Sequence, residues 1–285
     1  MTAFDTETIG RRFAAPPMAM TAERIAAYAR ATNETWPAAL AGEIAPPVIA
    51  FIALRPALRA ALRAVTPLYD QLKGLHGEQD IRVRTPIVAG MVLEPTVEVV
   101  GIAARSSGVV VVLRAESVAD GELVSTQHTA MYFRGATLAD AVGVDAPGHP
   151  LPPAIAASEP DAVVDDRVDE DQPARYAAAS GDTGRYHLDV QAAREAGLPG
   201  IIGHGVCTLA FAARAVTGVA CGGDPAGVRR LAARFAHPLR PGDELATSVW
   251  RLGPVAAGLA AYGFEAAAGD GTVVLRSGRV EVLAS

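Results

Sequence analysis

The sequence predicts an α+β fold in which one unit, a long apolar helix followed by an antiparallel sheet, is used twice. In each half of the 285-residue chain, a short helical segment and a polar loop precede an apolar helical run and then several strand-like runs. Landmarks recur at a nearly constant offset: Tyr28 as Tyr176 (148 residues), Asp120-Gly121 as Asp270-Gly271 (150) and Pro86 as Pro238 (152). Such an offset is typical of duplication, and the length accommodates two domains of ordinary size.

The helices of the N-terminal half follow from their capping and breaking residues. Thr21 is a good N-cap for a helix over residues 22–31. After a turn-rich loop, an apolar helical run extends to about residue 65. Pro56 lies inside this run. Because proline removes a backbone hydrogen bond, we expect this helix to be shorter or bent compared with its C-terminal counterpart.

Strand signals occupy the rest of this half. Four runs alternate in polarity or are β-branched: residues 81–84, 96–100, 109–115 and 125–133. Gly108 and the pair Asp120-Gly121 predict hairpin turns between them. We therefore expect an antiparallel sheet made of strands that are neighbours in the sequence.

A segment rich in proline, glycine and alanine separates the two halves. Its composition is typical of a linker, here over residues 136–160. This divides the chain into an N-terminal repeat over residues 1–135 and a C-terminal repeat over residues 161–285. In the second repeat, Asp171 is expected to cap a helix that has Pro173 in its first turn.

Composition and charge argue against several classes of protein. The formal charge of −6 argues against a nucleic-acid partner. The N-terminus has no apolar signal-peptide region and the apolar runs are too short to span a bilayer, so we expect a cytoplasmic protein. Two cysteines cannot form a disulfide framework, and the sequence has no phosphate-binding loop, dinucleotide fingerprint or ligand-spaced Cys/His cluster. We expect no metal and no redox cofactor.

Candidate chemistry is concentrated in residues 175–205. A helical run breaks at Ser180-Gly181, and the polar loop after it carries Asp182 and His187. Gly205 then opens an apolar helix, which is apolar nearly all round and so is expected to be buried on most sides. General acid–base catalysis requires two titratable groups that converge, with donors where negative charge develops. An aspartate after a glycine is often only a turn former, so the neighbouring motifs decide its meaning.

These neighbouring motifs resemble those of the MaoC-like dehydratases. Tyr176, the triplet Ser180-Gly181-Asp182 and His187 match the hydratase 2 motif in register. His204-Gly205, at the head of the apolar helix, matches the motif that follows in the family. Residues 234–243 resemble its strand-and-turn signature. Three motifs in the family's order make the resemblance specific, and it covers the C-terminal half.

The resemblance, which is to the (R)-specific enoyl-CoA hydratase type, implies a double hot-dog fold. It implies hydration of a trans-2-enoyl thioester to the (R)-3-hydroxyacyl thioester, or the reverse dehydration. Asp182 and His187 would hold one water and divide the base and acid roles, while the backbone N–H of Gly205 would stabilise the thioester oxygen. The residues expected to contact the substrate are Gly184, Tyr186, Ile202, Phe51 and Arg234.

Coenzyme A or an acyl carrier would then be part of the substrate, and we expect a homodimer. His204 would shape the turn before the helix. The four arginines Arg229, Arg230, Arg234 and Arg240 are candidates to bind coenzyme A phosphates, or they are ordinary surface side chains.

The N-terminal repeat lacks the catalytic groups. Glu34 stands opposite the aspartate, no histidine lies between residues 32 and 51, and Phe51-Ile52 stands opposite His204-Gly205. We therefore expect only the C-terminal repeat to be catalytic. The apolar side chains of residues 48–54 predict instead an acyl tunnel that runs into the N-terminal half and favours acyl chains longer than four carbons. His76 lies at the start of a predicted strand and is not expected to be catalytic.

Two alternative functions stay open at this stage. A hot-dog acyl thioesterase would need a carboxylate near a helix start but would not need His187. A non-catalytic acyl-thioester-binding protein would need neither group. This last hypothesis is supported by Gly184 and Arg185, which stand where the family has Asn and Pro. Glycine supplies no side-chain amide to fix the loop.

Overall fold

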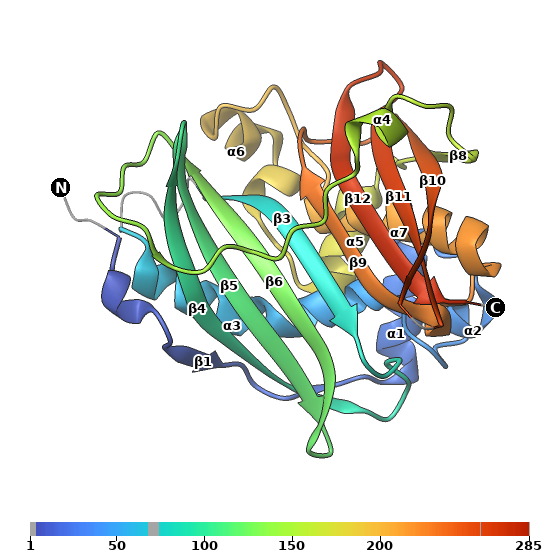
Figure 1. Cartoon of the computed structure of the whole chain (residues 1–285), viewed down its shortest axis with the longest axis horizontal. Coiled ribbons are helices and arrows are strands. Elements are labelled where there is room, and N and C mark those ends of the chain that lie inside the picture. Colours follow the sequence, from blue (N-terminus) through green and yellow to red (C-terminus); the bar gives the residue numbers. More distant parts are fainter. Residues whose placement is uncertain (1–3, 68–73, 257, 285) are drawn as a thin grey trace. The chain divides into compact units, whose positions relative to one another are not determined.

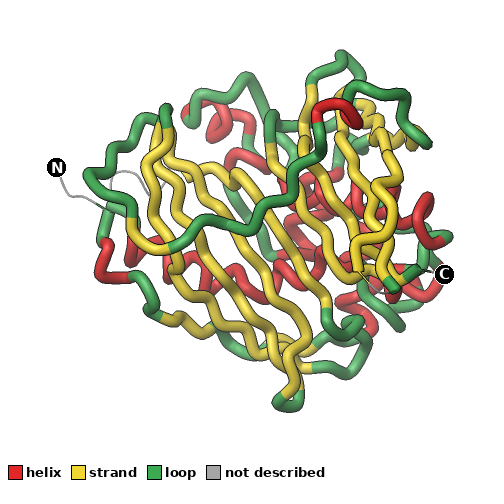
Figure 2. The backbone as a smooth tube through the Cα atoms, viewed as in Figure 1, coloured by secondary structure: helices red, strands yellow, loops and turns green. Residues whose placement is uncertain are grey.

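The computed structural model describes residues 4–67, 74–256 and 258–284. The chain divides into two compact units, and each is an antiparallel sheet packed on one long helix (Figures 1 and 2). The first unit comprises Met1–Ala19, Ala50–Thr85 and Met91–Gly148, and the second comprises Met20–Ile49, Pro86–Gly90 and His149–Ser285. Because each unit consists of an antiparallel sheet packed on a long helix, the predicted α+β class is confirmed.

The strands of the first unit follow the order β1-β4-β5-β6-β3, with antiparallel pairing throughout. Their bounds are β1 (Arg12–Ala14), β3 (Gly74–Val83), β4 (Val92–Arg105), β5 (Gly108–Ala119) and β6 (Glu122–Arg134). The short strands β2 (Met18–Ala19) and β7 (Val142–Gly143) pair with β4, and η1 (Thr6–Thr8) precedes β1. The helix α3 (Ala50–Val65) packs on β4 and β5. Each of the four predicted strands is present and is longer than predicted.

Helix α3 continues through Pro56. It has 16 residues, compared with 17 for α7 (Gly205–Cys221), the long helix of the second unit. Proline removes one backbone hydrogen bond, the one that would reach Ile52. The side chains of Phe51, Leu54 and others on the helix stay buried. Because packing of an apolar face stabilises helices more than intrinsic propensity does, the proline does not end the helix.

A band of polar side chains lies buried in the sheet of the first unit. Gln79, Gln127 and Thr129 are at most 1% exposed. Nε2 of Gln79 donates to Oε1 of Gln127 (2.9 Å), and the hydroxyl of Thr129 donates to Oε1 of Gln79 (2.8 Å). Ser117 and Ser125 face each other on β5 and β6, and neither hydroxyl has a hydrogen-bond partner among the residues that the structure describes. The interior of this unit is therefore not purely apolar.

The strands of the second unit follow the order β9-β12-β11-β10-β8, again antiparallel. Their bounds are β8 (Ala162–Arg167), β9 (Val228–Phe235), β10 (Glu244–Ala256), β11 (Leu259–Ala268) and β12 (Val273–Leu283). Helix α7 packs on all five strands. Every residue of α7 from Val206 to Ala213 is buried, which confirms the expectation for this apolar helix.

Shorter helices complete the second unit. They are α1 (Ala22–Ala31), α2 (Pro37–Leu40), η2 (Pro47–Ile49), α4 (Pro153–Ala156), α5 (Gln172–Ser180), η4 (Arg185–His187), α6 (Val190–Glu195) and η5 (Pro225–Gly227). Within the described part of the chain, no helix is long and apolar enough to cross a membrane.

Helix α1 belongs to the second unit, although it precedes α3 in the sequence. The ring of Tyr28 packs edge-on against that of Tyr176 in α5, with centroids 5.9 Å apart. The amide of Gln172 donates to the carbonyl of Ala31 at the end of α1. The second compact unit therefore includes α1, because this helix of the first repeat packs on the equivalent helix of the second.

The starts of α1 and α5 test the capping predictions. Thr21 caps α1 as predicted, and its hydroxyl accepts from the backbone N–H of Arg24 (3.2 Å). Asp171 occupies the N-cap position of α5, with Pro173 in the first turn, but its side chain makes no capping hydrogen bond. Its carboxylate accepts from Nε of Arg175 instead (3.0 Å).

The segment over residues 136–160 is anchored at several points. Val142 pairs with Ile102 of β4 in the first unit. In the second unit, Nδ1 of His149 lies 2.6 Å from the carbonyl oxygen of Ser277, and Leu151 is buried beside Gly263. This segment therefore forms a fixed part of each unit that it joins.

Candidate active site

The loop that carries Asp182 begins where α5 ends. Gly181 closes α5 with φ +70°, a left-handed conformation that glycine adopts without a steric penalty. The hydroxyl of Ser180 then accepts from the backbone N–H of Asp182 (3.1 Å). In turn, Oδ1 of Asp182 accepts from the backbone N–H of Gly184 (3.4 Å). These bonds fix the direction of the loop.

The turn η4 places His187 in the interior. Its imidazole is 6% exposed, and Nδ1 lies 2.8 Å from the carbonyl oxygen of Ile202. The ring of Tyr186, which is 42% exposed, packs on the outer side of His187 with centroids 4.3 Å apart. The imidazole is therefore held on one edge by a backbone carbonyl and is covered on one side by a phenol ring.

The start of α7 is fixed by the strand-and-turn segment over residues 234–243. The backbone N–H of Gly203 donates to the carbonyl of Leu239 (2.7 Å). A β-carbon at Gly205 would lie 3.1 Å from Cδ1 of Phe235, closer than most side-chain contacts. Glycine thus allows the helix start to approach this strand. The first N–H groups of a helix have no acceptor within it and carry its positive dipole end, which favours anions.

His204 lies between these segments and touches both. It is 2% exposed, and its Nε2 lies 3.0 Å from the backbone carbonyl oxygen of Asp182. Its ring stacks on that of His187, with centroids 3.8 Å apart and an interplanar angle of 26°. Ligand-type atoms of Asp182, His187 and His204 all lie within 4.8 Å of one another. The structure thus brings together the two residues that the sequence singled out and adds a third.

The two backbone contacts fix the tautomers of the imidazoles. A carbonyl oxygen can only accept, so Nδ1 of His187 and Nε2 of His204 carry protons. In the neutral form, His187 therefore has its lone pair on Nε2, which is the nitrogen able to accept a proton.

The same geometry is poorly suited to a metal ion. The lone pair of an imidazole lies in the plane of its ring, so the lone pairs of two stacked rings run side by side and do not converge on one ion. The stacking of His187 and His204 therefore fits proton transfer better than metal ligation.

Buried hydroxyl and thiol groups lie behind His204. The ring of Tyr176 is 4.9 Å from that of His204, and Tyr28 packs behind Tyr176. Burial raises the pKa of both phenols, and it raises the pKa of the Cys207 thiol to about 12. All three groups therefore keep their protons near neutral pH and form an uncharged support for the site. Cys207 is buried, and its protonated thiol is a poor nucleophile near neutral pH.

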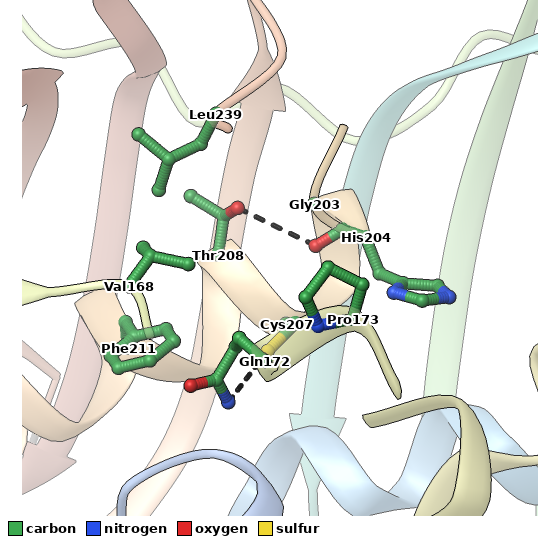
Figure 3. Close-up of a pocket in the computed structure, with 9 residues that line it drawn as sticks. All are labelled: Val168, Gln172, Pro173, Gly203, His204, Cys207, Thr208, Phe211 and Leu239. Atoms are coloured by element: carbon green, nitrogen blue, oxygen red, sulfur yellow. Dashed lines mark hydrogen bonds between the residues drawn. The ribbon is translucent and has the colours of Figure 1, made fainter. Parts of the chain in front are cut away.

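A small pocket opens beside the start of α7 (Figure 3). It is lined by Val168, Gln172, Pro173, Gly203, His204, Cys207, Thr208, Phe211 and Leu239. The imidazole of His204 points away from the other side chains drawn there. The hydroxyl of Thr208 donates to the carbonyl of His204 (3.4 Å) inside the first turn of the helix. Apart from His204, the lining of this pocket supplies no acid or base that is active near neutral pH.

The residues expected to contact the substrate fall into two groups. Gly184, Tyr186 and Ile202 lie against His187 in the second unit. Arg234 is an exposed residue of β9 in the same unit. Phe51 belongs to the first unit, where it is buried in α3 and stacks on His76 at 5.3 Å. The roles of all five in substrate binding stay predictions.

The three other arginines considered for phosphate binding make contacts within the protein. Arg230 is 9% exposed and lies 3.4 Å from Glu281. Arg229 donates to the carbonyls of Ala226 and Val228. Arg240 pairs with Asp243 at 3.6 Å. These contacts favour structural roles for the three side chains.

Comparisons with protein families identify both halves of the chain. The MaoC like domain matches residues 154–261, and the MFE-2 hydratase 2 N-terminal domain matches residues 44–135. The 3-hydroxyacyl-thioester dehydratase Y of Mycobacterium tuberculosis is 35% identical over 237 residues, covering 80% of this chain and 79% of that one. The peroxisomal enoyl-CoA hydratase 2 of Arabidopsis thaliana is 30% identical, covering 65% of this chain and 62% of that one.

Solved structures agree on the fold. A MaoC-like dehydratase from Phytophthora capsici superposes with a TM-score of 0.84 at 20% identity, covering 99% of this chain and 98% of that one. A Mycobacterium tuberculosis protein described as a double hot-dog fold superposes with a TM-score of 0.66 at 17% identity, covering 96% of each chain. The double hot-dog prediction is confirmed.

Proposed function

Because this chain belongs to the MaoC-like dehydratase family, with a hydratase 2 N-terminal domain, we propose that it hydrates trans-2-enoyl thioesters to (R)-3-hydroxyacyl thioesters, or runs the reverse dehydration. The observation that carries this proposal is the pairing of Asp182 with His187. His187 is buried and its Nδ1–H is held by Ile202, so the lone pair of the neutral imidazole is on Nε2, and a ring nitrogen of His187 lies within 4.8 Å of a carboxylate oxygen of Asp182. The arrangement suits two groups that act on one water molecule.

In the hydration direction, the oxygen of water attacks C3 of the enoyl thioester. A water proton passes to the Asp182/His187 pair, and the pair delivers a proton to C2. The pair therefore ends in the protonation state in which it began. General acid–base assistance of this kind contributes typically about 10²–10⁴-fold to the rate.

Negative charge develops on the thioester oxygen as the water adds. The backbone N–H of Gly205 is the first of α7, a helix of 17 residues, and helix geometry leaves this N–H without an acceptor inside the helix. We assign it the role of oxyanion donor. Loss of such a donor costs on the order of 3 kcal/mol in transition-state stabilisation.

The thioester handle of the substrate would be coenzyme A or an acyl carrier. We also propose that the enzyme uses no redox cofactor and no metal; the stacking of the two imidazoles supports only the second part. We also propose that the enzyme is a homodimer and that it acts in the cytoplasm.

The test is direct measurement of hydration. Crotonyl-CoA and longer enoyl-CoA esters are incubated with the purified protein, and the loss of enoyl-thioester absorbance is followed. The proposal predicts loss of absorbance without release of free thiol. Release of free coenzyme A without hydration would identify a thioesterase, and no reaction with any enoyl thioester would contradict the proposal.

A further inference from the structure

His204 has contacts that exceed those needed to shape a turn. It is the N-cap residue of α7, but its side chain makes no capping hydrogen bond. Its Nε2 lies instead 3.0 Å from the backbone carbonyl oxygen of Asp182, and its ring centroid lies 3.8 Å from that of His187. One buried side chain thus touches both members of the proposed acid–base pair.

Each contact constrains one member of the pair. The hydrogen bond to the carbonyl of Asp182 fixes the backbone from which that carboxylate projects. The stacking contact with His204 covers one face of the His187 ring. The ring of Tyr186, the preceding residue in η4, also packs on His187. The remaining freedom of His187, rotation about its side-chain bonds, is limited by the bond to Ile202. Both reacting groups therefore depend on the position of one imidazole.

The position of His204 is itself determined by a row of buried rings. Tyr176 is 1% exposed and packs on His204 with centroids 4.9 Å apart. Tyr28, which is 0% exposed, packs on Tyr176 at 5.9 Å. These tyrosines are repeat-related, and Tyr28 comes from α1 of the repeat that lacks catalytic groups. The first repeat thus contributes a helix to the support of the site.

We propose that His204 is a positioning residue of the hydratase site, which aligns the Asp182 loop and the His187 ring and is held by Tyr176 and Tyr28. The proposal rests on the proposed function. It assigns no proton transfer to His204. It also gives the N-terminal repeat a role in catalysis through α1, since Tyr28 packs on Tyr176, which packs on His204.

Three substitutions separate the two contacts. His204→Phe keeps a ring that can stack on His187 but loses the N–H donor. His204→Gln keeps an N–H that can reach the carbonyl of Asp182 but loses the ring. His204→Ala loses both. A misplacement of reacting groups by about 1 Å can cost about 10²-fold in rate, so we expect kcat to fall about 10²-fold in the Ala variant and by a smaller factor in the Phe and Gln variants.

The Michaelis constant should change less than about threefold in all three variants, since the Gly205 N–H and the expected substrate contacts remain. Circular dichroism and Tm verify that each variant is folded at the assay temperature. His237→Gln is the matched control, because His237 is exposed and its Nδ1 also bonds to a backbone carbonyl, that of Val273 (2.9 Å). It should keep wild-type kcat.

Tyr28→Leu tests the support from the first repeat. It removes the ring behind Tyr176 and should lower kcat about threefold to tenfold in the folded variant, again with little change in KM.

Two results would overturn this assignment in a protein whose wild type hydrates enoyl thioesters. One is a folded His204→Ala variant with kcat within threefold of wild type. The other is a loss in kcat that is equal in the Ala, Phe and Gln variants and follows the unfolded fraction, which would mean a purely structural role. Failure of the wild type to hydrate any enoyl thioester would instead contradict the proposed function.

Discussion

Gly184 lies against the imidazole of His187: a β-carbon at position 184 would be 3.1 Å from Cδ2 of His187 and 3.6 Å from Oδ1 of Asp182. Gly184 has φ −55°, a value open to any residue, so its backbone does not require glycine. The side chain at this position would instead touch both members of the acid–base pair. This makes position 184, where the family has Asn, a place to test the loop.

Gly184→Asn should raise kcat/KM or leave it unchanged. The backbone accepts the substitution, and the amide can add a hydrogen bond in the loop if His187 shifts by a few tenths of an ångström. Gly184→Ala is the matched variant, since it adds the β-carbon that crowds His187 but no side-chain amide. It should be less active than the Asn variant. Steady-state kinetics on one enoyl-CoA compare the two. A large, equal loss in both would show that the loop tolerates no side chain here.

Asp182→Asn and His187→Ala should each lower kcat by at least about 10²-fold, because each removes one end of the proton transfer. Asp189→Asn is a suitable control. Asp189 is an exposed carboxylate in the same segment that caps α6 by accepting from Ala192 N–H (2.8 Å), and asparagine caps a helix equally well. Near-wild-type kcat in either folded site variant would refute the assignment of the pair.

The ion pair of Asp166 with Arg214 should make stability depend on pH. It joins β8 to α7, and the two side chains are 12% and 16% exposed. Burial raises the pKa of Asp166, an effect that the Arg214 guanidinium opposes. Because the folded pKa lies above the unfolded one, this group favours folding most at low pH, and the gain is lost as pH rises through the folded pKa.

Asn cannot titrate at position 166, so the Tm of wild type minus that of Asp166→Asn should become more positive as pH is lowered from 7 to about 4. Thermal unfolding followed by circular dichroism at several pH values measures this difference. A difference that is constant, or that falls with pH, would contradict the raised pKa. Replacing both partners by apolar residues of similar volume should restore most of the stability lost in either single variant.

The buried serines of the first unit, Ser117 and Ser125, are positions where removing a polar group should not destabilise the protein. Their hydroxyls are buried without a partner among the described residues, and burying an unsatisfied polar group costs about 1–3 kcal/mol. Ser117→Ala and Ser125→Ala should therefore keep or raise the free energy of unfolding, measured by denaturant titration. A loss above about 1 kcal/mol in either variant would show that the hydroxyl is satisfied by another group, such as a water.

Local signals in the sequence were enough for much of the fold. Thr21 marks the start of α1, and the apolar periodicity marks α7, because capping and burial leave a direct trace in neighbouring residues. The pairing of Asp182 with His187 was predicted from a motif and is present in the structure. The effect of Pro56 was less predictable, since the packing of α3 on its sheet stabilises the helix beyond what local propensity indicates.

Contacts between residues far apart in the sequence were not predictable in this way. Tyr28 and Tyr176 are identical at equivalent places of the two repeats, but nothing in either repeat indicates that the two rings touch. The assignment of α1 to the second unit follows from that contact. Likewise, His204 was expected to shape a turn, because its stacking on His187 depends on the fold of two loops.

The central claim is that the Asp182/His187 pair hydrates an enoyl thioester with (R) stereochemistry, and one measurement tests it most directly. Crotonyl-CoA is incubated with wild type and with His187→Ala, and the 3-hydroxybutyryl-CoA formed is resolved by chiral chromatography. We predict that wild type forms the (R) product in large excess and that the variant forms at least about 10²-fold less in the same time. Formation of the (S) product, or equal formation of the (R) product by the folded variant, would contradict the claim.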